Sequence, residues 1–411
     1  MPTPQDTNTS RKMHFGRYDY AAFSSFLAYA AGSIIIPVAL VTIARDLAFP
    51  LESGGLNAGG LLHLARTIPM VATMLLCGFL AARIGNRKSL ALAVVLMAIG
   101  LLICAISPIY GILFIALMIA GLGEGIIEGL ATPFIQNIHV NDQPGRYINF
   151  AHGFWPVGIF LTVIASGIFL SLGFSWRYLV AAIAILCLIP TALLLLPARS
   201  GHEYPENPEP FDARTVLGHA LTLARTPRFW LYFTAMFLAG GGEFSLTFWA
   251  ASYIQLNFTD TAWAGSLGII CFALGMFISR TGWGYLIKQQ QLKQLVTYSA
   301  IAGAFITILF PFITSMSLFM ILLFFAGIAA APYWPSVQSY AADRLPHVDT
   351  TMLFILLSCA GIPGCGVFTW LIGLIGYLTG SLTFAFFLIP MAFTLLAIII
   401  TIDWLLLTKS P

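Results

Sequence analysis

Hydrophobic runs of about 20 residues recur along almost the whole chain, and this repetition limits what it can fold into. A transmembrane helix needs about 20 predominantly apolar residues to cross a bilayer. Apolar residues make up 59% of this sequence and charged residues 9%, far from the balance of a soluble domain. We therefore predict an all-α, multi-pass membrane protein. The candidate spans are twelve: 20–45, 57–82, 88–108, 111–138, 149–172, 177–197, 229–256, 261–287, 293–314, 316–342, 350–378 and 381–407.

The basic residues predict the orientation of these spans. If both termini are cytoplasmic, fifteen of the nineteen Lys and Arg residues lie in or beside cytoplasmic segments, and only Arg45 and Arg177 lie near the outside. Such an excess in cytoplasmic loops is general for membrane proteins. We expect a monomer in the plasma (inner) membrane, with both termini inside. No basic cluster is interleaved with aromatic residues, so we expect no nucleic-acid partner.

A polar interval divides the predicted spans into six and six. It covers residues 198–228, and apolar residues at helical spacing from Asp212 to Arg225 predict a helix on the membrane surface. A flexible linker with the same composition is the alternative. The predicted organisation is an N-terminal six-helix bundle (1–197), a cytoplasmic linker (198–228) and a C-terminal six-helix bundle (229–411).

The two halves also carry traces of internal repetition, which is common in secondary transporters. "GFLAARIGNRK" (78–88) ends span two, and "GMFISRTGWGYLIK" (275–288) ends span eight. Twelve helices in this arrangement resemble the major facilitator superfamily, and the first of these segments resembles its signature, with Ala82 in place of the usual acidic residue. The resemblance implies two pseudo-symmetric bundles that work by alternating access. It also implies gating roles for three basic residues: Arg83, Arg87 and Arg280.

A narrower resemblance is carried by four segments. "IIEGLATPFIQN" (126–137), "RYINFAHGFWPVG" (146–158), "GGGEFSLTFWAASYI" (240–254) and "GIAAAPYWPSV" (327–337) are similar to helices four, five, seven and ten of the fucose:proton symporters. This implies a sugar or a sugar derivative as the solute, and a proton carried by Glu128. Ser33 stands where those symporters have an aspartate in the first helix, which leaves Glu128 as the main candidate for proton coupling.

Charged residues inside spans are costly, so they usually face the protein interior and have a role. Glu124 and Glu128 are one helical turn apart, and two neighbouring carboxylates disfavour joint ionisation. Glu128, with Glu124 beside it, is predicted to carry a proton, or else to be a buried structural hydrogen-bonding group. Arg66 has two alternatives: it pairs with a glutamate of helix four, or it binds an anionic solute.

Several further residues are candidates for the solute site. His152 could relay a proton or be a hydrogen-bonded structural residue, and Asn149, one turn before it, suits sugar hydroxyls. Trp155 and Trp334 could stack on a sugar ring or anchor the protein at the membrane interface. Glu243 follows three glycines, which favour either a bending helix or close helix packing.

Motifs of other function classes are missing from the sequence. It has no phosphate-binding P-loop, no zinc-binding H-E-x-x-H and no G-x-S-x-G nucleophile motif. We expect no enzyme, no cofactor and no metal. The favoured prediction is a secondary transporter that moves a small polar solute with protons. The alternatives are transport of an anionic solute, proton-driven efflux of lipophilic compounds, and a receptor built on a transporter fold.

Overall fold

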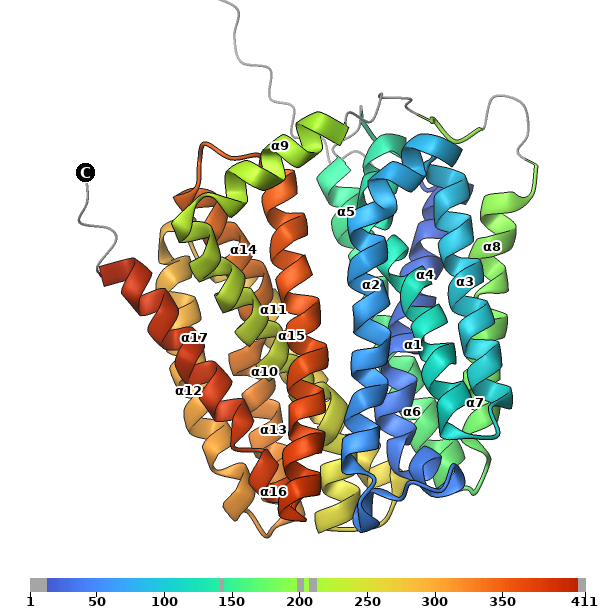
Figure 1. Cartoon of the computed structure of the whole chain (residues 1–411), viewed down its shortest axis with the longest axis vertical. Coiled ribbons are helices and arrows are strands. Elements are labelled where there is room, and N and C mark those ends of the chain that lie inside the picture. Colours follow the sequence, from blue (N-terminus) through green and yellow to red (C-terminus); the bar gives the residue numbers. More distant parts are fainter. Residues whose placement is uncertain (1–12, 141–143, 198–202, 207–212, 406–411) are drawn as a thin grey trace, which may run out of the picture.

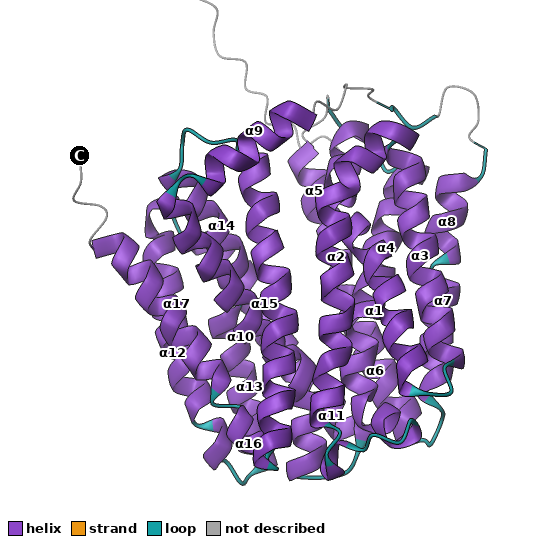
Figure 2. Cartoon of the chain, in the orientation of Figure 1, coloured by secondary structure: helices purple, strands orange, loops and turns teal. Residues whose placement is uncertain are grey.

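A computed structural model describes residues 13–140, 144–197, 203–206 and 213–405 of the 411-residue chain. Within these residues the regular structure is helical, with no strand (Figure 2). Eleven segments of the described chain are long and apolar enough to cross a membrane. The remaining predicted span, 229–256, corresponds to α10, which is 31 residues long but less apolar, since it contains Arg228, Glu243 and three consecutive glycines. The all-α membrane architecture is confirmed.

The helices form two side-by-side bundles (Figure 1). The first bundle contains α1 (Arg17–Asp46), α2 (Leu56–Ile84), α3 (Asn86–Ile106), α4 (Tyr110–Ile138), α5 (Pro144–His152), α6 (Phe154–Ser171), α7 (Trp176–Leu186) and α8 (Leu188–Leu195). The second contains α10 (Pro227–Asn257), α11 (Ala262–Leu286), α12 (Leu292–Ile308), α13 (Met316–Ala330), α14 (Tyr333–Arg344), α15 (Thr350–Thr379), α16 (Leu382–Ala385) and α17 (Leu388–Leu405). Helix α9 (Ala213–Ala224) lies across one end of the second bundle, and we call this end of the molecule the linker side.

Several predicted spans are interrupted helices. The span predicted at 316–342 is divided into α13 and α14, and Ala331 and Pro332 lie between them. The span at 149–172 is divided at Gly153, between α5 and α6. Proline removes one backbone donor and disturbs the preceding turn, so the paired prolines Pro332 and Pro335 explain the first interruption. Both interruptions lie beside predicted site residues.

Close packing of α2 against α4 depends on glycines, which have no side chain. A Cβ added to Gly121 would lie 2.2 Å from the carbonyl oxygen of Arg66, and one added to Gly125 would lie 2.1 Å from that of Met70. Small residues of this kind let membrane helices approach at backbone distance. The glycines of α4 therefore hold its backbone against α2 and bring Glu124 within reach of the Arg66 side chain.

On the linker side, each bundle is held by a polar cluster. His139 Nε2 at the end of α4 lies 2.6 Å from Asp19 Oδ1 on α1. In the second bundle the fully buried Asp403 of α17 accepts hydrogen bonds of 2.6 Å from Arg228 Nε and from the Tyr340 hydroxyl. Arg344 Nε lies 3.5 Å from the same carboxylate. These clusters fix the helix ends of each bundle separately.

Residues 203–206 of the linker pack on the first bundle, whereas α9 lies on the second. The Tyr204 ring stacks on Phe134 with centroids 4.2 Å apart. Burial raises the pKa of the Tyr204 hydroxyl. Glu206 accepts hydrogen bonds from the backbone N–H groups of Asn86 (2.8 Å) and Arg87 (3.1 Å) at the start of α3. The helix predicted from Asp212 to Arg225 is present as α9; residues 198–202 and 207–212 lie outside the described chain.

Candidate functional site

Two charged side chains inside the first bundle form an ion pair between α2 and α4. Arg66 Nε lies 2.5 Å from Glu124 Oε2, and the side chains are only 7% and 1% exposed. Arg66 Nη1 also donates a long hydrogen bond, 3.4 Å, to the carbonyl oxygen of Ser33 on α1. Of the two alternatives for Arg66, the structure contains the pair with a helix-four glutamate. The guanidinium therefore links three helices.

Glu128, one turn further along α4, has a different environment. Its side chain is half-buried, and the ion pairs of the described residues do not include it. The Tyr29 hydroxyl on α1 lies against the Glu128 carboxylate. Trp155 on α6 packs edge-on against the Tyr29 ring, with centroids 4.4 Å apart. Through Tyr29, the Glu128 carboxylate is thus connected to the indole of Trp155.

His152 extends this polar surface toward the linker side. Its Nε2 lies 2.9 Å from the Thr132 hydroxyl on α4, and its ring lies 4.6 Å from that of Phe26 on α1. Thr132 follows Glu128 by four residues, so both lie on one face of α4. Neither Thr132 nor Tyr29 was predicted from the sequence, although the i, i+4 spacing from Glu128 indicates Thr132. Asn149 lies in α5, but its side chain is outside the described structure.

The second bundle places Glu243 and Arg280 together. Arg280 Nη2 lies 3.1 Å from Glu243 Oε1, and Arg280 Nε donates to the carbonyl oxygen of Ala331, beside the α13–α14 interruption, also at 3.1 Å. The half-buried Trp334 at the start of α14 packs against α15, where a Cβ on Gly361 would lie 2.3 Å from the indole. The sequence did not predict that Arg280 would pair with Glu243.

The arginines predicted to act as gates make contacts within their own bundles. Arg83 lies over the Phe79 ring at 4.3 Å, and Arg87 Nη1 donates to the Leu194 carbonyl oxygen on α8 at 3.1 Å. The contacts of Arg280 are likewise internal to the second bundle. The gating roles of these three residues therefore stay predictions.

The two bundles meet through the halves of α2 and α15 that lie away from the linker side. Trp370 Nε1 donates to Asn57 Oδ1 at 3.0 Å, and a Cβ on Gly60 would lie 2.7 Å from the Thr369 carbonyl oxygen. Near the same contact, the His63 ring stacks on Phe244 of α10 with centroids 4.4 Å apart. The side opposite the linker is therefore tightly closed in this conformation.

Comparison with known proteins identifies the fold. The crystal structure of a D-xylose–proton symporter superimposes with a TM-score of 0.75 at 16% identity, over 93% of this chain and 96% of that one. The nucleoside transporter NupG gives 0.73 at 14% identity, over 95% and 98%. The fucose:proton symporter FucP of E. coli gives 0.63 at 17% identity, over 94% and 99%. At these identities the likeness concerns the fold.

Comparison of sequences gives one short match to a single protein and one long match to a family profile. The chain is 23% identical over 140 residues to an MFS-type efflux pump, MMF1, of Pseudozyma antarctica. That match covers 33% of this chain and 26% of the pump, so the chain aligns with about a quarter of its length. A family profile described as the Major Facilitator Superfamily matches residues 21–366, which is most of the chain. The chain therefore belongs to the major facilitator superfamily.

Proposed function

We propose that this protein is a secondary transporter that moves a small polar solute, a sugar or a sugar derivative, together with protons by alternating access. In this proposal both termini and the linker side face the cytoplasm of a plasma (inner) membrane. The conformation described above is then closed to the outside. The solute lies between the bundles and contacts His152, Asn149 and Trp155 on one side and Trp334 and Glu243 on the other.

The observation that carries the proposal is the contrast between the two glutamates of α4. Glu124 has a buried arginine as its counter-ion, whereas Glu128 has the Tyr29 hydroxyl as its neighbour, and the Tyr29 ring packs on Trp155. At membrane depth, a carboxyl group without a counter-ion avoids the large desolvation cost of its charge only when it holds a proton. Glu128 is thus suited to gain and lose a proton as the site is exposed to each side of the membrane in turn. Glu124 is suited to stabilise the bundle through its ion pair.

The test uses purified protein in proteoliposomes and a solute found by thermal-shift screening of neutral sugars, sugar acids and lipophilic cations. We expect a neutral sugar to stabilise the protein and to accumulate when the outside is acidic. Glu128→Gln should keep the thermal shift and sugar exchange but lose proton-driven accumulation. Glu52→Gln, which alters an exposed ion pair with Arg45, is the control and should behave like wild type. Accumulation by Glu128→Gln with an unchanged pH dependence would refute the coupling role.

The same screen also tests two other functions. Proton-driven efflux is supported by the partial match to an efflux pump, and stabilisation by lipophilic cations alone would favour it. Transport of an anionic solute requires Arg66 to leave Glu124 or to serve both partners. Stabilisation by sugar acids alone, lost in Arg66→Gln and kept in Arg66→Lys, would favour that function.

A further inference from the structure

A groove on the membrane-facing surface of the second bundle lies outside the candidate solute site. It has a volume of about 500 Å³ and is lined by α11, α12 and α13 and by the segment that joins α11 to α12. Its lining includes three small residues, Ser299, Ala302 and Ala329, which leave the space between the helices unfilled and which we call its floor. We propose that this groove binds one acyl chain of an anionic phospholipid, whose headgroup lies at the linker-side end of α12.

The surroundings of the groove identify hydrocarbon as its environment. Large apolar side chains on the same three helices are highly exposed, among them Phe277 on α11, Phe305 on α12 and Ile321 on α13. In a chain that spans a membrane, such a surface faces lipid tails. A groove between these helices is therefore filled from the bilayer, and an acyl chain is the component of the bilayer that has its shape.

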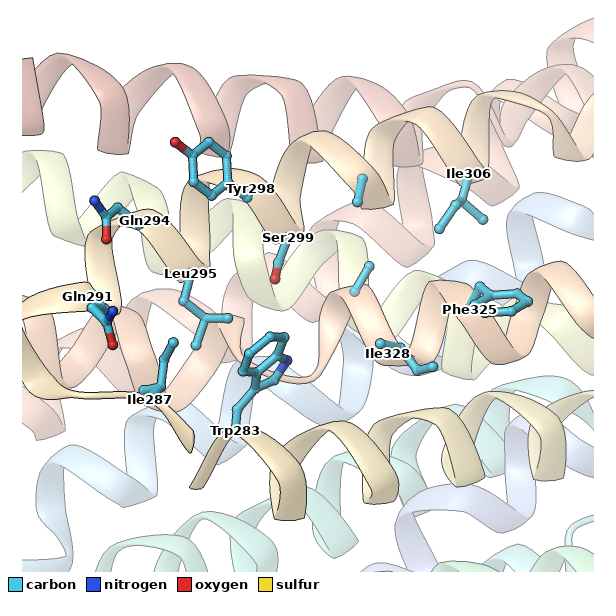
Figure 3. A pocket seen from close by; sticks show the side chains of 12 residues that line it. Trp283, Ile287, Gln291, Gln294, Leu295, Tyr298, Ser299, Ile306, Phe325 and Ile328 are labelled. Carbon is cyan, nitrogen blue, oxygen red and sulfur yellow. The ribbon is translucent and has the colours of Figure 1, made fainter. Parts of the chain in front are cut away.

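The polarity of the groove changes along its length in the direction expected for a phospholipid. Figure 3 shows Gln291 and Gln294 at one end and Ile306 and Phe325 at the other. The amide side chains lie at the linker-side start of α12, where a headgroup would lie, and the apolar side chains lie deeper. Trp283 and Tyr298 line the intermediate part, and amphipathic rings of this kind are enriched at membrane interfaces.

The length of the groove fits one leaflet. From Gln291 to Ile306 the chain advances fifteen residues, or about 22 Å at the rise of an α-helix. Half of a bilayer with its headgroup region is about 20–22 Å thick. A lipid whose headgroup is at Gln291 would therefore reach the bottom of the groove near Ile306 with its acyl chain.

Two lysines favour an anionic headgroup. Lys288 is exposed three residues before Gln291, and the Lys293 ammonium lies 5.4 Å from the Trp404 ring centroid. The acidic side chain of Asp343 accepts a hydrogen bond from Gln289 in this segment. Basic residues next to membrane helices attract anionic lipids by about 1 kcal/mol each. The preference for an anionic lipid rests on these charges and does not depend on the transported solute.

The position of the groove also connects it with the solute site. The floor residue Ser299 accepts, through its carbonyl oxygen, a 2.9 Å hydrogen bond from the Tyr333 hydroxyl. Tyr333 is the first residue of α14 and precedes Trp334. A bound acyl chain would therefore support α12 directly behind the helix that carries Trp334.

The test is a titration of delipidated protein in detergent with palmitoyl-oleoyl phosphatidylglycerol or phosphatidylcholine, followed by melting temperature and by native mass spectrometry. Wild type should be stabilised at lower concentrations of phosphatidylglycerol and should retain one such lipid. Ala302→Trp fills the exposed floor of the groove, and the steric conflict should raise the half-maximal concentration by at least about tenfold. Ile321→Trp adds the same ring to α13 outside the groove and should behave like wild type.

A second pair of variants keeps the proposal testable if Ala302→Trp does not fold. Ser299→Phe also narrows the floor and should weaken the binding of both lipids. Lys288→Gln should reduce the preference for phosphatidylglycerol and leave phosphatidylcholine binding unchanged. Equal binding of the two lipids by wild type, or unchanged phosphatidylglycerol binding in both groove variants, would overturn the proposal. Neither result bears on sugar transport, so the two proposals can fail separately.

Discussion

The pair of Arg66 and Glu124 gives the sharpest prediction for stability. Arg66→Gln removes the counter-ion of a carboxylate whose side chain is 1% exposed. Breaking a buried pair from one side costs about 3–5 kcal/mol, because the remaining charge stays desolvated. The lost bond to Ser33 adds little, since at 3.4 Å it is long. For bundles of about 200 residues, roughly 2–4 °C of melting temperature corresponds to 1 kcal/mol, so we expect a decrease of roughly 6–20 °C.

The measurement is thermal unfolding of the detergent-purified variants at several pH values. Because a protonated Glu124 carries no charge to bury, the deficit of Arg66→Gln should shrink as the pH falls. The double variant Arg66→Gln/Glu124→Gln leaves no unpaired charge and should recover most of the stability. Glu128→Gln is the matched control for Glu124→Gln. It makes the same substitution one helical turn away, at a glutamate without an ion pair, and should change the melting temperature little. An Arg66→Gln variant within 2 °C of wild type, or a double variant that is as unstable as the sum of the singles, contradicts the reasoning.

Three further predictions follow from other contacts. Gly60→Leu should prevent closure against α15 because a Cβ there already lies 2.7 Å from a backbone oxygen, and cysteine labelling from the side opposite the linker should increase. Glu206→Gln should weaken the two hydrogen bonds to the start of α3 by about 1 kcal/mol in total and increase protease cleavage of the linker. Asp403→Asn should lower the melting temperature by several degrees, because Arg228 and Arg344 lose a shared, fully buried carboxylate.

Part of the candidate site could be predicted from single positions. Five residues stand out because charges are rare within membrane spans: Arg66, Glu124, Glu128, Glu243 and Arg280. Which of these charges pair with each other could not be predicted from the sequence. The choice between Glu124 and Glu128 as partner of Arg66 depends on how far α4 is rotated about its axis, which the glycine contacts with α2 fix.

Other neighbours carried no signal in the sequence. Tyr29 is an ordinary aromatic residue in an apolar run, and only the packing of α1 beside α4 and α6 brings it to Glu128 and Trp155. The interruption between α13 and α14 was indicated by Pro332 and Pro335. Its contact with Arg280, 51 residues away in sequence, was not.

The sequence by itself determined the membrane class and the twelve spans, because the thickness of a bilayer imposes a length of apolar helix that can be recognised along the chain. The two-bundle family was implied by a resemblance of sequence segments. Only the tertiary structure decided which charges pair, which side of the molecule is closed and where the lipid-facing groove lies. A helix that is apolar on all faces does not reveal in its own sequence which face meets a neighbour. That information exists only once helices from distant parts of the chain pack together.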